Sequence, residues 1–213
     1  MERTYQKLIE GNREWVANKN RLDPDYFKKI ARGQTPQFLW IGCSDSRVPA
    51  NEITGTESGE IFVHRNIANM VFHSDINLLS VLQYSVEVLK VKDIMIVGHS
   101  GCGGVRAAIE GAGNLGLVSN WINPIRITYR DNQHCFTPAM SIEERTDRLV
   151  ELNVLRQVRN LSQTSIIQNA WKEGKGPFIH GLVYRLDDGK LRDLNLTLGS
   201  GMELPDVYEG IKL

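Results

Sequence analysis

Two short apolar runs, each followed by a polar loop, place the strongest constraint on the fold of this chain. They are Phe38-Leu-Trp-Ile-Gly42 and Asp93-Ile-Met-Ile-Val-Gly98, and both have the length and composition of buried strands. A third strand is expected over residues 60–65. A helix capped by Ser74 or Asp75 then follows, with one apolar face made of Ile76, Leu79, Leu82, Val86 and Leu89. Strands that alternate with helices in this way predict an α/β fold built on a parallel sheet.

Further helices and a hairpin are expected on either side of this region. Apolar positions at helical spacing predict two opening helices, over about residues 5–16 and 27–31. The pair Ser141 and Glu144 forms a capping-box signature at the start of a long helix, and Thr164 can cap the next helix. Residues 178–185 and 190–197, on either side of Asp188-Gly189, are typical of a hairpin at the edge of the sheet.

Length and charge exclude several classes of partner. The chain has 213 residues, enough for one large domain with one core, and its 25 basic and 25 acidic residues balance. Such a chain has no general field that would attract nucleic acid or an anionic membrane. No apolar run approaches the ~20 residues of a membrane span, and residues 1–19 lack the pattern of a signal peptide. We therefore expect a cytoplasmic protein that binds neither nucleic acid nor membranes.

Three residues in two strand-ending loops have the chemistry of zinc ligands. Cys43 follows the first apolar run, and His99 and Cys102 follow the second. Zinc prefers thiolate and imidazole ligands in a tetrahedral arrangement, and the carboxyl ends of parallel strands meet at one edge of a sheet. We expect the three side chains to converge there. Three protein ligands leave a fourth position open, which is typical of catalytic zinc.

Asp45 and Arg47 follow Cys43 at alternating positions, so an extended loop would point all three side chains the same way. Paired with Arg47, Asp45 leaves the metal open to water and can accept a proton from it. Bound to zinc, Asp45 fills the fourth position and closes the site. Two thiolates also cancel the charge of Zn²⁺, so we expect a bound water that is less acidic than in a site with three histidines, and activity that rises with pH.

The glycines around Cys102 favour a small, compact substrate. Gly98, Gly101, Gly103 and Gly104 let the backbone turn tightly and approach a ligand with no side chain in the way. Backbone N–H groups at a helix start could also hold an anion such as bicarbonate. Cys135, by contrast, has no such surroundings and is interpreted as a buried structural residue.

Three segments together resemble the β-class carbonic anhydrases, and the resemblance runs from the opening helices to about Asn195. They are Cys43-Ser-Asp-Ser-Arg-Val-Pro49, His64-Arg-Asn-Ile-Ala-Asn69 and Gly98-His-Ser-Gly-Cys-Gly-Gly104. The resemblance implies a twisted, mostly parallel sheet flanked by helices, zinc on Cys43, His99 and Cys102, and an Asp45/Arg47 catalytic pair. It also implies a homodimer, often paired into a tetramer, whose opening helices pack on the partner. We expect one domain with a helical arm (1–33), a zinc-binding α/β core (34–197) and a C-terminal tail (198–213).

A subset of this family has a second, non-catalytic bicarbonate site that stabilises the closed state. Trp40, Arg65 and Tyr184 match the three positions of that site. An arginine with an indole and a phenol is a reasonable pocket for a small anion, although Trp40 is equally compatible with a place in the core.

The resulting hypothesis is reversible hydration of carbon dioxide to bicarbonate and a proton. Zinc-bound hydroxide would attack carbon dioxide in a small apolar pocket at Val48 and Gly103. Two alternatives stay open from the sequence. One is a hydrolase for another heteroallene, carbon disulfide or carbonyl sulfide, and the other is a non-catalytic bicarbonate sensor held closed by Asp45.

Overall fold

The computed structural model describes residues 4–111, 113 and 115–202, which fall into two compact units divided between Thr35 and Pro36. Most of the tail expected over residues 198–213 lies outside the described residues. None of the described helices is both long enough and apolar enough to cross a membrane.

The first unit consists of the two helices expected from the sequence, α1 (Gln6–Leu22) and α2 (Tyr26–Ile30). Trp15 of α1 makes edge contacts with the rings of Tyr26 and Phe27, and these contacts join the two helices. Neither helix has a buried residue, and Leu8 is 75% exposed. Within this unit, α1 therefore buries none of the side chains of its apolar stripe.

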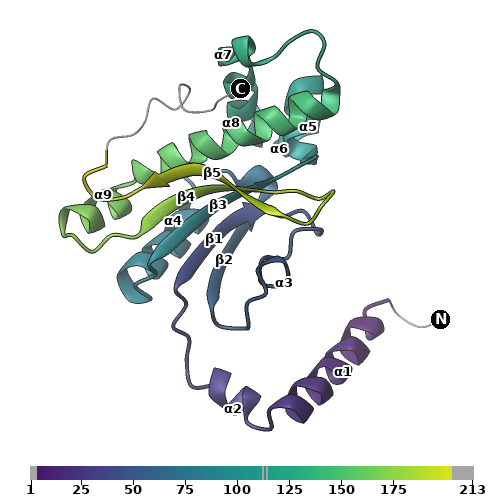
Figure 1. The fold of residues 1–213 in the computed structure, drawn as a ribbon, viewed down its shortest axis with the longest axis vertical. Coiled ribbons are helices and arrows are strands. Elements are labelled where there is room, and N and C mark those ends of the chain that lie inside the picture. The colour runs from purple at the N-terminus through teal and green to yellow at the C-terminus, as the bar shows by residue number, and fades with distance from the viewer. Residues whose placement is uncertain (1–3, 112, 114, 203–213) are drawn as a thin grey trace. The chain divides into compact units, whose positions relative to one another are not determined.

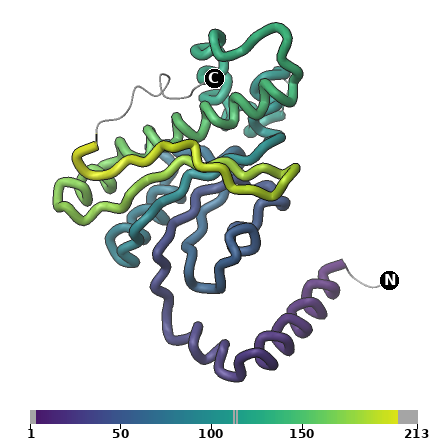
Figure 2. Tube along the Cα trace, viewed as in Figure 1, coloured from purple at the N-terminus to yellow at the C-terminus, as the bar shows by residue number. Residues whose placement is uncertain are grey.

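The second unit is built on a five-stranded sheet. Figure 1 shows its twist, and Figure 2 shows the same region as a tube. The strands are β1 (Phe38–Cys43), β2 (Ile61–Asn66), β3 (Asp93–His99), β4 (Phe178–Tyr184) and β5 (Leu191–Leu198), in the order β2-β1-β3-β4-β5. The first four are parallel, and β5 returns antiparallel to β4 as the second strand of the predicted hairpin. The predicted α/β fold with a mostly parallel sheet is confirmed.

Helices surround this sheet. They are α3 (Ala50–Thr54), α4 (Ile76–Gln83), α5 (Gly103–Glu110), α6 (Leu117–Trp121), α7 (Asn123–Asp131), α8 (Ile142–Ser162) and α9 (Ser165–Lys172), with short turns η1 (Ile67–Asn69), η2 (Tyr84–Val88) and η3 (Gln133–Cys135). Asp75 caps α4, Thr164 caps α9, and the capping box of Ser141 and Glu144 is formed at the start of α8. Three short helices, α3, α6 and α7, were not expected from the sequence.

One detail of the predicted α4 face needs correction. Leu82 and Val86 are buried as the pattern indicates, but Ile76 is 78% exposed. Ile76 stands at the first position of the helix, and the buried residues of α4 are Leu78 and Leu82, four positions apart, so the buried face is centred on these two leucines and Ile76 lies to one side of it.

The two faces of the sheet carry cores of different size. One face contributes Leu39, Ile41, Ile94 and Ile96 to the main core, which includes buried residues of α4, α5 and α8. The other face carries a small cluster of Trp40, Val48, Ala50 and Val97. Because β1 and β3 are parallel neighbours, their carboxyl ends lie side by side between these two cores.

Candidate functional site

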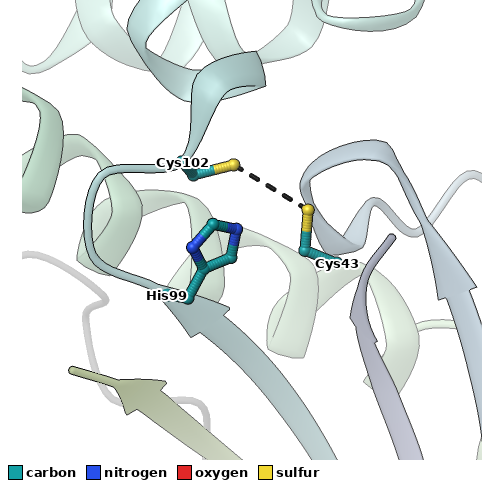
Figure 3. Close-up of side chains that lie close together, drawn as sticks. All are labelled: Cys43, His99 and Cys102. Atoms are coloured by element: carbon teal, nitrogen blue, oxygen red, sulfur yellow. Dashed lines mark hydrogen bonds between the residues drawn. The ribbon is translucent and has the colours of Figure 1, made fainter. Parts of the chain in front are cut away.

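Cys43, His99 and Cys102 converge at the carboxyl ends of β1 and β3. Cys43 is the last residue of β1, His99 is the last residue of β3, and Cys102 immediately precedes α5 (Figure 3). The sulfur atoms of Cys43 and Cys102 lie 4.0 Å apart, and the ligand atoms of all three residues lie within 4.8 Å of one another. Two sulfurs bound at about 2.3 Å to one tetrahedral ion would lie roughly 3.8 Å apart, so this spacing fits zinc.

The imidazole of His99 is prepared to act as a ligand. Its Nδ1 lies 3.0 Å from the backbone carbonyl of Ser100, and because a carbonyl only accepts, Nδ1 carries the proton. The lone pair is then on Nε2, which is buried and has no hydrogen-bond partner among the described residues. A buried, unpartnered nitrogen beside two sulfurs is the donor set expected of a metal site.

The two thiols are also electrostatically coupled. The hydrogen bond from the thiol of Cys102 lowers the pKa of Cys43 well below its ordinary value. The same shared proton, together with burial, raises the pKa of Cys102. A divalent cation bound between the two sulfurs would stabilise both as thiolates.

The carboxylate of Asp45 lies beside this group and is held by Arg47. Arg47 donates from Nε to Oδ1 at 2.9 Å and from a terminal nitrogen to Oδ2 at 2.7 Å, and its backbone N–H also donates to Oδ1. These hydrogen bonds hold the pKa of Asp45 well below its usual range. Oδ2 lies 3.7 Å from Nε2 of His99, so the carboxylate reaches the convergence point of the three ligands.

Val48 and Gly103, the residues expected to line a substrate pocket, are placed differently from each other. Val48 is fully buried in the small cluster with Trp40. Gly103 begins α5, and a Cβ atom added there would meet nothing within 4 Å. Open space therefore adjoins the backbone directly after Cys102.

Trp40, Arg65 and Tyr184 come from three strands and lie on the same face of the sheet. Trp40 is fully buried, yet its Nε1 has no hydrogen-bond partner among the described residues. Tyr184 packs against the same small cluster. Arg65 donates to the backbone carbonyl of Cys43 at 2.8 Å and to that of Asp45. The arginine thus holds the loop that carries Cys43 and Asp45.

Two further contacts at the site were not anticipated from the sequence. The backbone N–H of Ala68 donates to the sulfur of Cys43 at 3.4 Å, and the carboxylate of Asp147 accepts from the N–H of Gly101 at 2.9 Å. The sequence gives an indirect sign of the first contact only, namely buried polar side chains on α8, one of which, Asn153, donates to the carbonyl of Ala68. Asn153 and Gln157 interrupt the apolar stripe of α8, and buried amides at that spacing need partners.

Comparisons with known proteins point to one family. The sequence model described as carbonic anhydrase matches residues 38–191. A carbonic anhydrase of Emericella nidulans is 47% identical over 209 residues, which cover 98% of this chain and 91% of the relative. Among solved structures, a tetrameric β-carbonic anhydrase of Sordaria macrospora has 35% identity and a TM-score of 0.88, with 93% of this chain and 100% of that chain covered. The Coccomyxa β-carbonic anhydrase, solved with acetazolamide, has 35% identity and a TM-score of 0.86, covering 93% and 90%.

Proposed function

This chain belongs to the β-class carbonic anhydrase family, and on that premise we propose that it hydrates carbon dioxide reversibly with a zinc ion held by Cys43, His99 and Cys102. The observation that carries the proposal is the Nε2 of His99, which is buried and has no hydrogen-bond partner in the part of the chain that the structure describes, beside two sulfurs 4.0 Å apart and a carboxylate. Zinc bound there would supply the Lewis acidity that makes a water molecule more acidic and therefore a better nucleophile.

The chain's own residues position that water. In the arrangement seen, both oxygens of Asp45 are engaged by Arg47, and Oδ2 still faces His99. The carboxylate can therefore accept a hydrogen bond from a water at the convergence point and fix its orientation. Its low pKa keeps it an acceptor at every pH at which the enzyme would work. A turn of Asp45 away from Arg47 would bring it to the metal as a fourth ligand and close the site.

The substrate space is proposed beside Gly103 and Val48. The uncovered backbone at Gly103 leaves room next to Cys102 for a molecule of a few atoms. Val48 is tied to the same loop through its N–H, which donates to the carbonyl of Asp45 at 3.1 Å. A shift of this loop would therefore move the Asp45 carboxylate and the apolar side chain together.

Bicarbonate is proposed to inhibit hydration by binding at Trp40, Arg65 and Tyr184 and shifting the loop that carries Asp45. The unpartnered Nε1 of Trp40 is a donor that an anion could satisfy. Arg65 would be drawn toward the same anion, away from the carbonyls of Cys43 and Asp45. The loop held by Arg65 would then be free to deliver Asp45 to the metal.

We also propose that the chain is a homodimer or homotetramer, with the opening helices packed on a partner copy. The relative from Sordaria macrospora is described as tetrameric. In this chain the stripe of α1 is exposed, and so are Val63 on the edge strand β2 and Tyr84 on η2. Exposed large apolar side chains on an edge strand and on a helix with no buried residue are typical of an interface between subunits.

A direct comparison of substrates tests the proposed reaction against its closest alternative. Zinc-loaded protein is given carbon dioxide, carbon disulfide or carbonyl sulfide, with proton release and sulfide release as readouts. Faster turnover of carbon dioxide supports the proposal. Sulfide release without carbon dioxide hydration would instead assign a heteroallene hydrolase, and the absence of turnover with all three would favour a bicarbonate sensor.

A further inference from the structure

The turn η1 presents a backbone donor to one of the proposed zinc ligands from an uncommon conformation. Ala68 has φ 60° and ψ 32°, and Asn69 has φ 48°. Both residues are buried, and consecutive residues with side chains rarely adopt the left-handed region unless their surroundings hold them there. In this conformation the N–H of Ala68 lies 3.4 Å from the sulfur of Cys43.

Amide side chains of α8 hold this turn. Nδ2 of Asn153 donates to the carbonyl of Ala68 at 3.0 Å, and Oε1 of Gln157 accepts from the N–H of Val71 at 2.8 Å. The two amides also bond to each other, because Nε2 of Gln157 donates to Oδ1 of Asn153 at 2.9 Å. Asn153 and Gln157 are 1% and 0% exposed, so neither amide exchanges these partners for bulk water.

The hydrogen-bonded row of amides on α8 continues with Asn160, which follows Gln157 by three residues. Nδ2 of Asn160 donates to the carbonyl of Val71 at 3.1 Å and to Oε1 of Gln157 at 3.2 Å. Asn160 therefore makes the same kind of bond to the same segment, but three residues beyond Ala68. A comparison of variants at Asn153 and Asn160 can therefore distinguish a general role in holding residues 68–71 from a specific role at Ala68.

We infer that Asn153 is a positioning residue for the metal centre, which sets the N–H of Ala68 against the sulfur of Cys43. A hydrogen bond donated to a thiolate sulfur draws charge from it and weakens its donation to a bound metal. A metal bound by Cys43, His99 and Cys102 would then keep more of its Lewis acidity despite two thiolate ligands. The inference rests on the proposed function in one respect, namely that Cys43 is a metal ligand.

A purely structural role makes a different prediction. If Asn153 only stabilises the core, its loss lowers the free energy of unfolding and leaves the electronic state of the sulfur unchanged. If Asn153 positions the donor, its loss makes the sulfur more electron-rich at unchanged metal occupancy. The energy of the sulfur-to-cobalt charge-transfer band in cobalt-substituted protein measures that difference directly.

The experiment compares cobalt-loaded wild type with Asn153→Ala and the matched control Asn160→Ala. We expect the charge-transfer band of Asn153→Ala to move to lower energy, and that of Asn160→Ala to keep the wild-type position. At equal zinc occupancy, Asn153→Ala should hydrate carbon dioxide about tenfold more slowly, the low end of what loss of an outer-shell partner costs. A wild-type band in Asn153→Ala, or the same shift in both variants, overturns the inference.

A second measurement needs no variant and therefore does not depend on the folding of Asn153→Ala. In ¹¹³Cd-loaded wild type, a hydrogen bond from Ala68 to a metal-bound sulfur gives a scalar coupling between ¹¹³Cd and the amide proton of Ala68. Its absence overturns the inference. If cobalt and cadmium report the bond but the zinc protein does not hydrate carbon dioxide, the proposed function fails and the inference stands. Failure of the wild type to bind any of these metals rejects both.

Discussion

The carboxylate of Asp45 is bound to the guanidinium of Arg47 by two side-chain hydrogen bonds, of 2.9 and 2.7 Å. The residues are only two positions apart, so the loop after β1 forms this pair locally. The pair leaves one oxygen of Asp45 facing His99 at 3.7 Å. In the proposed mechanism, Arg47 holds the carboxylate where it can accept a hydrogen bond from a water molecule, and release from Arg47 would let it turn toward the metal.

Replacement of Arg47 by alanine should slow carbon dioxide hydration by about 100-fold, because an unheld Asp45 no longer orients the water. Metal content should stay that of the wild type, since Arg47 contributes no ligand. Stopped-flow rates and metal analysis on the same sample measure both quantities. Arg185→Ala is a matched control, because Arg185 makes the same two-bond pair with Asp187 two positions away. Equal losses in the two variants would contradict a specific role for Arg47.

Replacement of Cys43 by alanine should abolish metal binding and, with it, activity. The remaining ligands, His99 and Cys102, are too few for a stable zinc site. Metal analysis after gel filtration, compared with wild type, checks this outcome. Cys135→Ala serves as the control, since Cys135 is also buried but stands outside the convergent group. A Cys43→Ala protein that retains stoichiometric zinc would reject the proposed ligand set.

The convergence of the ligands could be predicted because it follows from topology. Buried strands that end at Cys43 and at His99 had to be parallel neighbours to bring these residues together, and β1 and β3 are so paired. The Asp45/Arg47 pair was likewise predictable, since it lies within one loop. Local capping chemistry also fixed the starts of α4, α8 and α9.

The contacts that support the site from elsewhere in the chain could not be predicted. The N–H of Ala68 reaches the sulfur of Cys43 because η1 adopts a left-handed conformation. The residues in that conformation are Ala68 and Asn69, so no glycine in the sequence indicates it. The bond between Asp147 and Gly101 joins a helix to a loop 46 positions away, and no periodic pattern specifies such a pair. The exposure of Ile76 was missed because apolar residues at positions 76, 78, 79 and 82 allow more than one apolar face, and the structure buries the face centred on Leu78 and Leu82.

Acidification should destabilise the fold through His64. Burial lowers the pKa of His64, and Nδ2 of Asn66 lies 3.3 Å from its Nε2 as a donor to the neutral ring. The unfolded histidine binds a proton near pH 6.5 while the folded one stays neutral, so stability is complete above that pH and falls below it. Relative to that of His64→Gln, the free energy of unfolding of wild type should fall by at most about 1.4 kcal/mol per pH unit between pH 7 and 5.5. Denaturant titrations of both proteins at several pH values measure this difference, and parallel curves would contradict it.

Replacement of Tyr184 by phenylalanine should weaken inhibition by bicarbonate. The change removes only a hydroxyl group from the proposed anion site, and one hydrogen bond to a charged ligand corresponds to about a tenfold change in affinity. The bicarbonate concentration that halves the initial hydration rate should therefore rise by about tenfold. Tyr129→Phe is the control, because Tyr129 packs against Phe136 in a different part of the chain. Identical inhibition of wild type and Tyr184→Phe would remove Tyr184 from the site.

In the proposed reaction, a metal on Cys43, His99 and Cys102 drives carbon dioxide hydration. Stopped-flow hydration between pH 6.5 and 9, on protein of measured zinc content, tests it most directly. We expect a rate that climbs with pH, disappears when zinc is chelated and returns when zinc is restored. A protein with one zinc per chain and no hydration at pH 9, or a rate that survives chelation, would contradict it.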